Sequence, residues 1–302
     1  MTAQIKIIKE YKEVLDLDNN VLSTFLTQVT ELDKNGNTLK DTKYREDGSV
    51  DDVEVMEYND KGKLVESSFY FNGDELHENL KFVYFEDGET INEILKTFGD
   101  GSIEKTIVEK EGNVYTSTIF NEDDESEGVE IVKKDDNGNV VEHVIYNDMH
   151  QIESRDVYCY DANGNILERI HFGYDDVFEN KKVSTYNDKG FCTAITYLDE
   201  KGNILEVTKY TLDENGNVTY MREGDYQETF YAYNINGDVV SVKTIDLESN
   251  TVSFQANYEY DNNNLQVGYY PLIGSYQRKM SLDVFMGAEG KVNKTRTEYE
   301  FY

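Results

Sequence analysis

One turn motif is repeated along this chain, and its spacing limits the folds that are open to it. Segments of the form Asp/Asn-x-x-Gly, often followed by Asn and then Ile, Leu or Val, recur mostly at steps of 10 to 16 residues. In the clearest stretch, Gly138, Gly164, Gly190 and Gly216 are each 26 residues apart. Turn signals at such spacing are typical of short antiparallel strands joined by hairpins. The sequence therefore predicts a repeat array in which one period is a pair of hairpins.

The chemistry of a tight turn explains the residue types in the motif. An Asp or Asn at the first position hydrogen-bonds to the backbone two residues on, and a Gly at the fourth position supplies the left-handed conformation that closes a type I turn with a bulge. We predict structural turn roles for the following residues: Asp33, Gly36, Asp60, Gly62, Asp136, Gly138, Asp161, Gly164, Asp188, Gly190, Asp199, Gly202, Asp213, Gly216 and Gly237.

The side chains between the turns alternate in character. Period-two alternation over residues 158–174 predicts one face with Tyr158, Ile170 and Phe172, and a charged face with Arg169 and His171. An apolar face must be covered, and long sheets twist and roll. We therefore predict an all-β fold, an antiparallel meander of about twenty short strands that rolls or spirals into a barrel-like sheet filled by Tyr and Phe. The alternative is a flat solenoid whose apolar face docks on a partner.

The motif resembles a known repeat. The wording of "YDANGNIL" at 160–167 and "LDENGNV" at 212–218 resembles the YD repeats of bacterial Rhs and insecticidal toxin-complex proteins. The resemblance covers about residues 15–265, is strongest over 130–265, and implies a continuous β-sheet that spirals into a shell. Toxins of that family are far larger and enclose a toxic C-terminal domain. This chain is too short to enclose a protein and lacks their C-terminal cleavage segment, so encapsulation is not implied.

The two ends depart from the repeat. We expect residues 1–14 to form an N-terminal cap, as a strand or short helix, residues 15–265 the repeat array, and residues 266–302 the C-terminal capping strands of one continuous domain. A final hairpin about 287–292 should lead into the strand "TEYEFY". This last part carries the only proline, Pro271, and the basic residues Arg278, Lys279, Lys291, Lys294 and Arg296.

The charge of the chain restricts its partners. It has 61 acidic and 29 basic residues, a net charge of −32. Nucleic acid and anionic membrane surfaces would be repelled, whereas encounter with a basic protein would be accelerated. The other interpretation is that the charge only keeps a repetitive β-protein soluble.

One segment is more acidic than the rest. Residues 121–130, "NEDDESEGVE", interrupt the repeat and favour either a solvated mobile loop or a contact site for a basic partner. We predict partner binding at six acidic residues: Glu122, Asp123, Asp124, Glu125, Glu127 and Glu130.

Signatures of catalysis and of metal binding are missing from the sequence. The four histidines, His77, His143, His150 and His171, lie in different repeats, and no P-loop, dinucleotide or zinc-protease motif occurs. Cys159 and Cys192 show no metal-ligand or disulfide spacing. The Asp/Asn-rich turns lack the sixth-position Gly and twelfth-position acid of an EF-hand. We expect no enzyme and no cofactor, with weak Ca²⁺ binding at these turns as the alternative.

The N-terminus lacks the apolar segment of a signal peptide, and no apolar run of 18 residues exists. We therefore expect a cytoplasmic protein without membrane insertion, or an exported one if an export signal has been removed. The leading hypothesis is an immunity or antitoxin-like inhibitor of a basic protein. The alternatives are a structural or cell-envelope repeat protein that binds glycan through exposed Tyr rows, and a scaffold of a secretion or injection system.

Overall fold

The computed structural model describes residues 4–16, 20–272 and 292–302, and it is an all-β protein. Within these residues it has 22 strands and one short 3-10 helix, η1 (Tyr174–Asp176). Strands that follow one another in sequence pair in antiparallel fashion, so the predicted all-β antiparallel meander is confirmed. The chain divides into two compact units, Met1–Met56 with Phe69–Glu75 and Tyr210–Tyr302 (unit 1), and Glu57–Ser68 with Leu76–Lys209 (unit 2).

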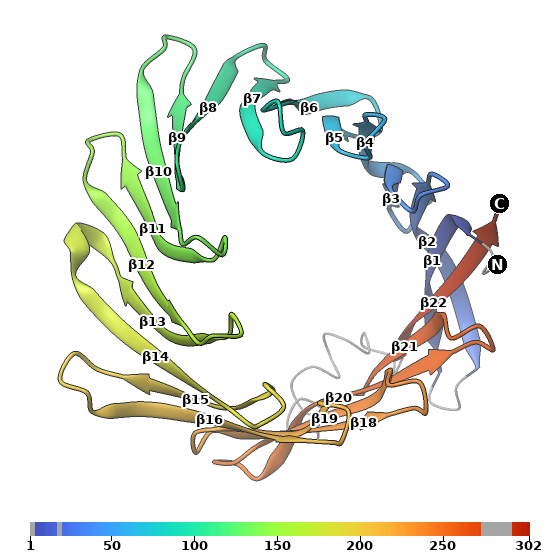
Figure 1. The fold of residues 1–302 in the computed structure, drawn as a ribbon. Coiled ribbons are helices and arrows are strands. Elements are labelled where there is room, and N and C mark those ends of the chain that lie inside the picture. Colours follow the sequence, from blue (N-terminus) through green and yellow to red (C-terminus); the bar gives the residue numbers. More distant parts are fainter. Residues whose placement is uncertain (1–3, 17–19, 273–291) are drawn as a thin grey trace. The chain divides into compact units, whose positions relative to one another are not determined.

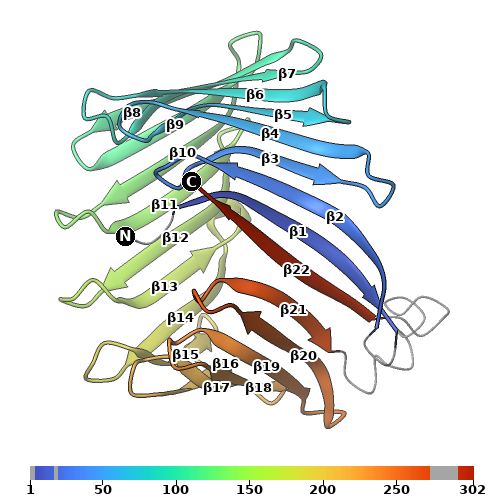
Figure 2. The same ribbon diagram turned by 90° about the vertical axis from the view of Figure 1, so that its right-hand side faces the viewer.

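Unit 1 contains the two ends of the chain. Its final strand pairs with its first strand, and Figure 2 shows β22 running beside β1. The paired order is therefore β17 to β22, then β1 to β4. The strands are β1 (Ile5–Leu15), β2 (Val21–Leu32), β3 (Thr38–Tyr44), β4 (Val50–Tyr58), β17 (Val218–Glu223), β18 (Gln227–Tyr233), β19 (Val239–Asp246), β20 (Thr251–Tyr260), β21 (Gln266–Leu272) and β22 (Val292–Phe301).

Unit 2 is a run of successive hairpins, whose tips follow one another in Figure 1. From β6 to β16 each strand pairs with the next one along the chain. Its strands are β5 (Leu64–Phe71), β6 (Glu75–Tyr84), β7 (Ile91–Phe98), β8 (Ile103–Glu111), β9 (Val114–Phe120), β10 (Ser126–Lys134), β11 (Val140–Asn147), β12 (Ile152–Tyr160), β13 (Ile166–Phe172), β14 (Phe178–Tyr186), β15 (Cys192–Leu198) and β16 (Ile204–Leu212).

The turn at 161–165 shows how the motif works. Asp161 Oδ1 accepts hydrogen bonds from the backbone N–H groups of Asn163 and Asn165, at 2.8 and 2.9 Å. The Asn165 side chain donates to Asp161 Oδ2 at 2.8 Å, and this bond is the main reason that the pKa of Asp161 lies below its usual value. Gly164 has φ +85, in the left-handed region that a type I turn with a bulge requires. The Asn that follows the Gly therefore completes the turn.

The predicted turn residues fall into two groups. All eight glycines have φ between +75 and +90, and Asp33, Asp161, Asp199 and Asp213 accept the turn hydrogen bonds. Asp60, Asp136 and Asp188 also lie in turns, but at the second turn position, one residue after the acceptor. There the acceptors are the preceding residues Asn59, Asp135 and Asn187, because the first position of a turn lies three residues before its glycine.

The predicted assignment of side chains to faces was also wrong. In the β12–β13 hairpin, Tyr158 lies opposite Arg169, and Val157 lies opposite Ile170. Opposite residues share a face, so Tyr158 lies with Arg169 and not with Ile170. Opposite Cys159 and Tyr160, a bulge adds one residue to β13 and shifts the alternation of its side chains between the two faces by one residue. Most hairpins carry such a shift, so both faces hold a mixture of apolar and charged residues.

Among the described residues, no aromatic side chain is buried in either unit. Only four hydrophobic side chains of the described residues are buried, Leu15, Val53, Val144 and Ala256, and none of them is aromatic. The expectation that Tyr and Phe fill the inside is therefore wrong. Most side chains on both faces are half-buried, because they pack against cross-strand neighbours in a sheet one layer thick.

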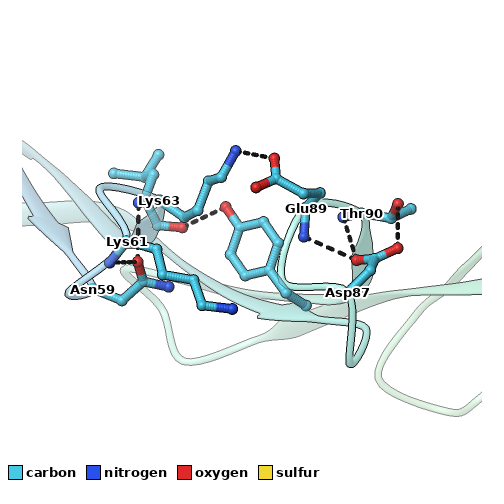
Figure 3. A network of polar contacts seen from close by, with 8 residues as sticks. Asn59, Lys61, Lys63, Asp87, Glu89 and Thr90 are labelled. Carbon is cyan, nitrogen blue, oxygen red and sulfur yellow. Dashed lines mark hydrogen bonds and ion pairs between the residues drawn. The ribbon is translucent and has the colours of Figure 1, made fainter.

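Tyrosine hydroxyls tie neighbouring turns together. Figure 3 shows two adjacent turns of unit 2, one containing Asn59 and the other Asp87, joined by the ion pair of Lys63 with Glu89. The Tyr84 hydroxyl donates to the carbonyl oxygen of Leu64 at 2.8 Å, immediately after the first turn. The same bond recurs in unit 2 at Tyr160 and Tyr186, and in unit 1 at Tyr233 and Tyr260.

The chain ends are strands of unit 1. Residues 5–15 form β1, which pairs with β2 on one side and with β22 on the other. In β22, Arg296 contacts Glu13 at 2.7 Å and Lys294 contacts Glu259 at 3.0 Å. The predicted hairpin about 287–292 lies outside the described residues except for Val292, where β22 begins, and Arg278, Lys279 and Lys291 also lie outside them.

Candidate functional site

The turns that join odd-numbered to even-numbered strands lie on one edge of the unit 2 sheet. We call four of them, 121–125, 147–151, 173–177 and 199–203, the acidic edge, after the turn at 121–125 with its four consecutive acidic residues. Their tips follow one another in Figure 1 at the ends of β9–β10, β11–β12, β13–β14 and β15–β16. The turns at 59–63, 85–90, 135–139, 161–165 and 187–191 form the opposite edge.

The predicted partner-binding residues are divided between a turn and a strand. Glu122, Asp123, Asp124 and Glu125 occupy the turn at 121–125 and are exposed. Glu127 and Glu130 belong to β10. The segment does not interrupt the repeat, because Asn121 accepts turn hydrogen bonds from Asp123 and Glu125 as in the other turns. It is an ordinary hairpin turn with four acidic residues.

The charges of this turn are not neutralised nearby. In the part of the chain that the structure describes, the side chains of Glu122, Asp123, Asp124 and Glu125 form no ion pair. Glu130 differs, because its Oε1 lies 2.6 Å from His143 Nε2 on the neighbouring strand. The four turn carboxylates therefore remain available to a basic side chain from outside.

Three neighbouring turns of the acidic edge have residues other than glycine in the left-handed conformation. These are Asp124, His150, Asp175 and Asp176, with φ between +55 and +60. The left-handed conformation costs a non-glycine residue about 1–2 kcal/mol. The next turn of the edge returns to glycine, Gly202. Within unit 2, the described non-glycine residues with positive φ all lie in the turns at 121–125, 147–151 and 173–177, whereas Asn72, Asn250 and Asn264 have the same conformation in unit 1. Strained backbone conformations often occur at functional sites.

Exposed apolar side chains lie on the same edge. We call the following five residues, which are between 53% and 71% exposed, the apolar ridge: Met149, Tyr174, Val177, Ile204 and Leu205. Tyr174 is held by a 2.6 Å hydrogen bond from its hydroxyl to Gln151 of the neighbouring turn. Arg155 contacts both Asp176 at 2.6 Å and the ring of Phe172, which fixes the base of the 173–177 turn.

A polar cluster lies on one face of β12–β14. Asp156 accepts two hydrogen bonds from Arg169, at 2.8 and 2.9 Å, and lies 3.0 Å from His171 Nδ1. Burial raises the pKa of Asp156, but the bonds to Arg169 and His171 outweigh burial and hold the pKa below its usual value. Glu179 lies 3.4 Å from the other nitrogen of His171. Each member has a partner, so the cluster joins three strands.

The two thiols and the carboxylates offer little for metal chemistry. Cys159 is exposed, and the pKa of the half-buried Cys192 is raised by burial. Among the described residues, no group of three or more His, Cys, Asp or Glu side chains is placed to hold a metal ion. In turns such as 161–165, both oxygens of the first Asp already accept hydrogen bonds within the turn. A search of the described residues for a helix long and apolar enough to span a membrane finds none.

In unit 1, tyrosines gather on one face of the sheet. Tyr258 lies opposite Tyr269, with ring centroids 5.2 Å apart. Burial raises the pKa of Tyr231 and of Tyr269 on the same face. Strand alternation and register place six half-buried tyrosines together over β18 to β22: Tyr231, Tyr233, Tyr258, Tyr260, Tyr269 and Tyr299.

Sequence reasoning found the turn at 121–125, which we call the acidic turn, but missed the apolar ridge. Turn positions in this chain are mostly Asp, Asn, Gly, Glu, Lys and Ser, so Met149, Tyr174 and Val177 stand out once the turns are aligned. The spacing of the turns on a single edge was already readable from the 26-residue period. The cluster about Asp156 was missed because its members are far apart in sequence and depend on the shifted register.

Comparison with known proteins gives only distant structural likenesses. No family model matches the chain, and no curated protein matches it. A chain in the Photorhabdus luminescens Tc holotoxin pore with the TccC3-D651A mutation is 12% identical with a TM-score of 0.40, covering 93% of this chain and 16% of that chain. A chain of the TcdB2–TccC3 complex is 12% identical with a TM-score of 0.34, covering 92% and 16%. This chain thus spans about a sixth (16%) of the Tc chains.

A third similar structure has about the length of this chain. It is a porin-like protein from Bacteroides uniformis, 10% identical with a TM-score of 0.34, and the match covers 99% of this chain and 98% of that one.

Proposed function

We propose that this chain is a non-enzymatic binding protein built from YD-type β-hairpin repeats, and that its partner is a basic protein. The observation that carries the proposal is the turn at 121–125, where four exposed carboxylates have no ion pair within the described residues. The net charge of −32 supplies a long-range attraction for a basic surface. The strained turns beside it support the same location.

The most concrete form of this function is an immunity or antitoxin-like inhibitor. Such a protein neutralises a basic toxin by occupying its surface, and charge complementarity gives the fast association that an inhibitor needs. It would act in the cytoplasm, the compartment expected from the sequence, without a cofactor.

The test compares two variants of equal charge. In the first, the acidic turn is neutralised by Glu122→Gln, Asp123→Asn, Asp124→Asn and Glu125→Gln. The control removes four charges from the opposite edge of the same unit, by Asp60→Asn, Glu86→Gln, Asp136→Asn and Asp188→Asn. Basic proteins captured at low salt from the native host are purified, and their association rate constants with both variants are measured against salt.

The proposal predicts that the turn variant slows association by about tenfold more than the control, because local charges act most strongly on encounter. It also predicts that cells producing the captured basic protein are protected when they also produce this chain. Equal slowing by both variants would mean that only the overall charge matters. If no basic protein binds in a stoichiometric ratio, the proposal is wrong.

A second candidate function is supported by the tyrosine face of unit 1. Aromatic rings held on a rigid sheet are suited to sugar rings, and the hydroxyls of Tyr233 and Tyr260 are fixed by bonds to the backbone at 2.7 and 2.8 Å. Envelope polysaccharide should then quench tyrosine fluorescence with little dependence on salt. The variant Tyr258→Ser with Tyr269→Ser should abolish that quenching, and an unchanged signal would reject this candidate.

A further inference from the structure

The apolar ridge lies next to the acidic turn along the acidic edge. Met149 belongs to the turn at 147–151, Tyr174 and Val177 to the next turn, and Ile204 and Leu205 directly follow the one after. Each of these side chains is more than half exposed, whereas most apolar side chains of unit 2 are half-buried on the faces of the sheet. Single exposed apolar residues are normal on a protein surface, but exposed apolar residues that recur on successive turns of one edge are a candidate interaction site.

The spacing of the ridge favours a particular partner geometry. Successive turns on one edge are two strands apart, or about 9.6 Å. Seven residues of an α-helix advance about 10.5 Å. A helix lying along the edge, across the ends of the strands, would therefore present an apolar side chain to each turn at every seventh residue. Contact with all three turns of the ridge needs about 14 residues.

The charges around the ridge define the polar side of that helix. The turns at 121–125, 147–151 and 173–177 contain acidic residues and no Lys or Arg, and the turn at 199–203 contains two acidic residues and one lysine, Lys201. Asp148 and Asp175 form no ion pair within the described residues, like the four acids of the first turn. Lys or Arg residues beside the apolar stripe of a helix would complement these carboxylates, whereas an acidic helix would be repelled.

We infer that the acidic edge of unit 2 binds a basic amphipathic α-helix of about four turns, whose apolar stripe packs on the ridge while its basic residues face the acidic turns. The inference rests on the proposed function and adds to it the form in which the basic partner is recognised. In this arrangement the apolar ridge supplies most of the affinity for the helix, and the acidic turn increases the rate at which the helix associates.

Three synthetic probes of about 18 residues test this inference. The first is a Leu/Lys peptide with leucines at helical spacing, the second has the same composition in scrambled order, and the third is oligolysine. Binding is measured by fluorescence anisotropy over a range of salt concentrations. The ridge variant is Met149→Thr, Val177→Thr and Leu205→Thr, and it keeps Tyr174 and its hydrogen bond. The control replaces three other exposed apolar residues, Leu22→Thr, Val83→Thr and Ile235→Thr, of which Ile235 is 100% exposed.

We expect the amphipathic peptide to bind about tenfold or more tightly than the scrambled peptide, because the ridge buries its leucines. The ridge variant should lose this preference while keeping its salt dependence, and the control variant should keep both. Equal binding of the two peptides, equal weakening by both variants, or no binding at all would overturn the inference.

The same experiment separates this inference from the proposed function. Loss of salt-dependent attraction in the acidic-turn variant, together with an absent ridge effect, would support a basic partner but reject the helix. A ridge effect that persists when the acidic turn is neutralised, with no change in salt dependence, would reject the basic partner.

Discussion

The hydroxyl of Tyr160 donates a hydrogen bond of 2.6 Å to the carbonyl oxygen of Val140, twenty residues earlier. Tyr160 is the residue before the turn at 161–165, and Val140 is the residue after the turn at 135–139. The bond therefore joins one turn of the opposite edge to the next. In a sheet with so few buried side chains, bonds of this kind replace part of the cohesion that a core would supply.

Removal of this hydroxyl should destabilise the protein. Tyr160→Phe keeps the ring but takes the donor from the Val140 carbonyl, at an expected cost of about 1 kcal/mol in the free energy of unfolding. Urea denaturation followed by circular dichroism measures the change. The control is Tyr226→Phe, at a side chain that is 64% exposed. Equal losses in the two variants would show that the hydroxyl of Tyr160 contributes nothing specific.

The Asn after the turn glycine should control the titration of the turn Asp. In Asn165→Ala, the pKa of Asp161 should rise toward its usual value, because the bond from the Asn165 side chain is the main cause of its depression. A depressed pKa stabilises the fold above the unfolded-state value of 3.8, and this contribution is lost as pH falls through the folded-state pKa. Carboxyl NMR titration detects the shift. Asn163→Ala, which changes a side chain outside that bond, should leave the pKa of Asp161 low.

Replacing a strained residue in the turns of the acidic edge by glycine should stabilise the protein. His150 has φ +57, and His150→Gly should raise the free energy of unfolding by about 0.5–1 kcal/mol because glycine adopts this conformation at little cost. The reciprocal change Gly202→Ala, at φ +83 on the same edge, should lower it by about 1 kcal/mol. Thermal unfolding of both variants checks the pair. Destabilisation by His150→Gly would mean that the histidine side chain stabilises its turn.

Alkaline pH should weaken the fold through its tyrosines. Burial is the main cause that raises the pKa of several of them. A tyrosine with a raised pKa contributes stability that is complete below the unfolded-state pKa of 10.0 and is lost as the pH rises through the folded-state pKa. The free energy of unfolding should therefore fall above about pH 10. Absorbance at the tyrosinate band, recorded with and without urea, should show later ionisation in the folded protein. Coincident titration curves would contradict the prediction. The tyrosines concerned are Tyr11, Tyr158, Tyr160, Tyr220, Tyr231, Tyr233, Tyr260, Tyr269 and Tyr299.

The sequence by itself determined the all-β class, the order of the hairpins and the position of most turns. These properties are local, since the bonds between Asp161, Asn163 and Asn165 involve residues at most four apart. The acidic turn could be located for the same reason, because its four carboxylates are consecutive in the chain.

Only the tertiary structure decided which side chains share a face of the sheet. It also decided which turns have a strained backbone and which of them lie beside exposed apolar side chains. One bulge residue per hairpin shifts the alternation, so the pairing of Tyr158 with Arg169 depends on strand register rather than on parity within a strand. The contact of Asp156 with His171, the row from Met149 to Leu205 and the pairing of β22 with β1 all join segments brought together by that register. Register is set by hydrogen bonds between strands, and no single strand contains that information.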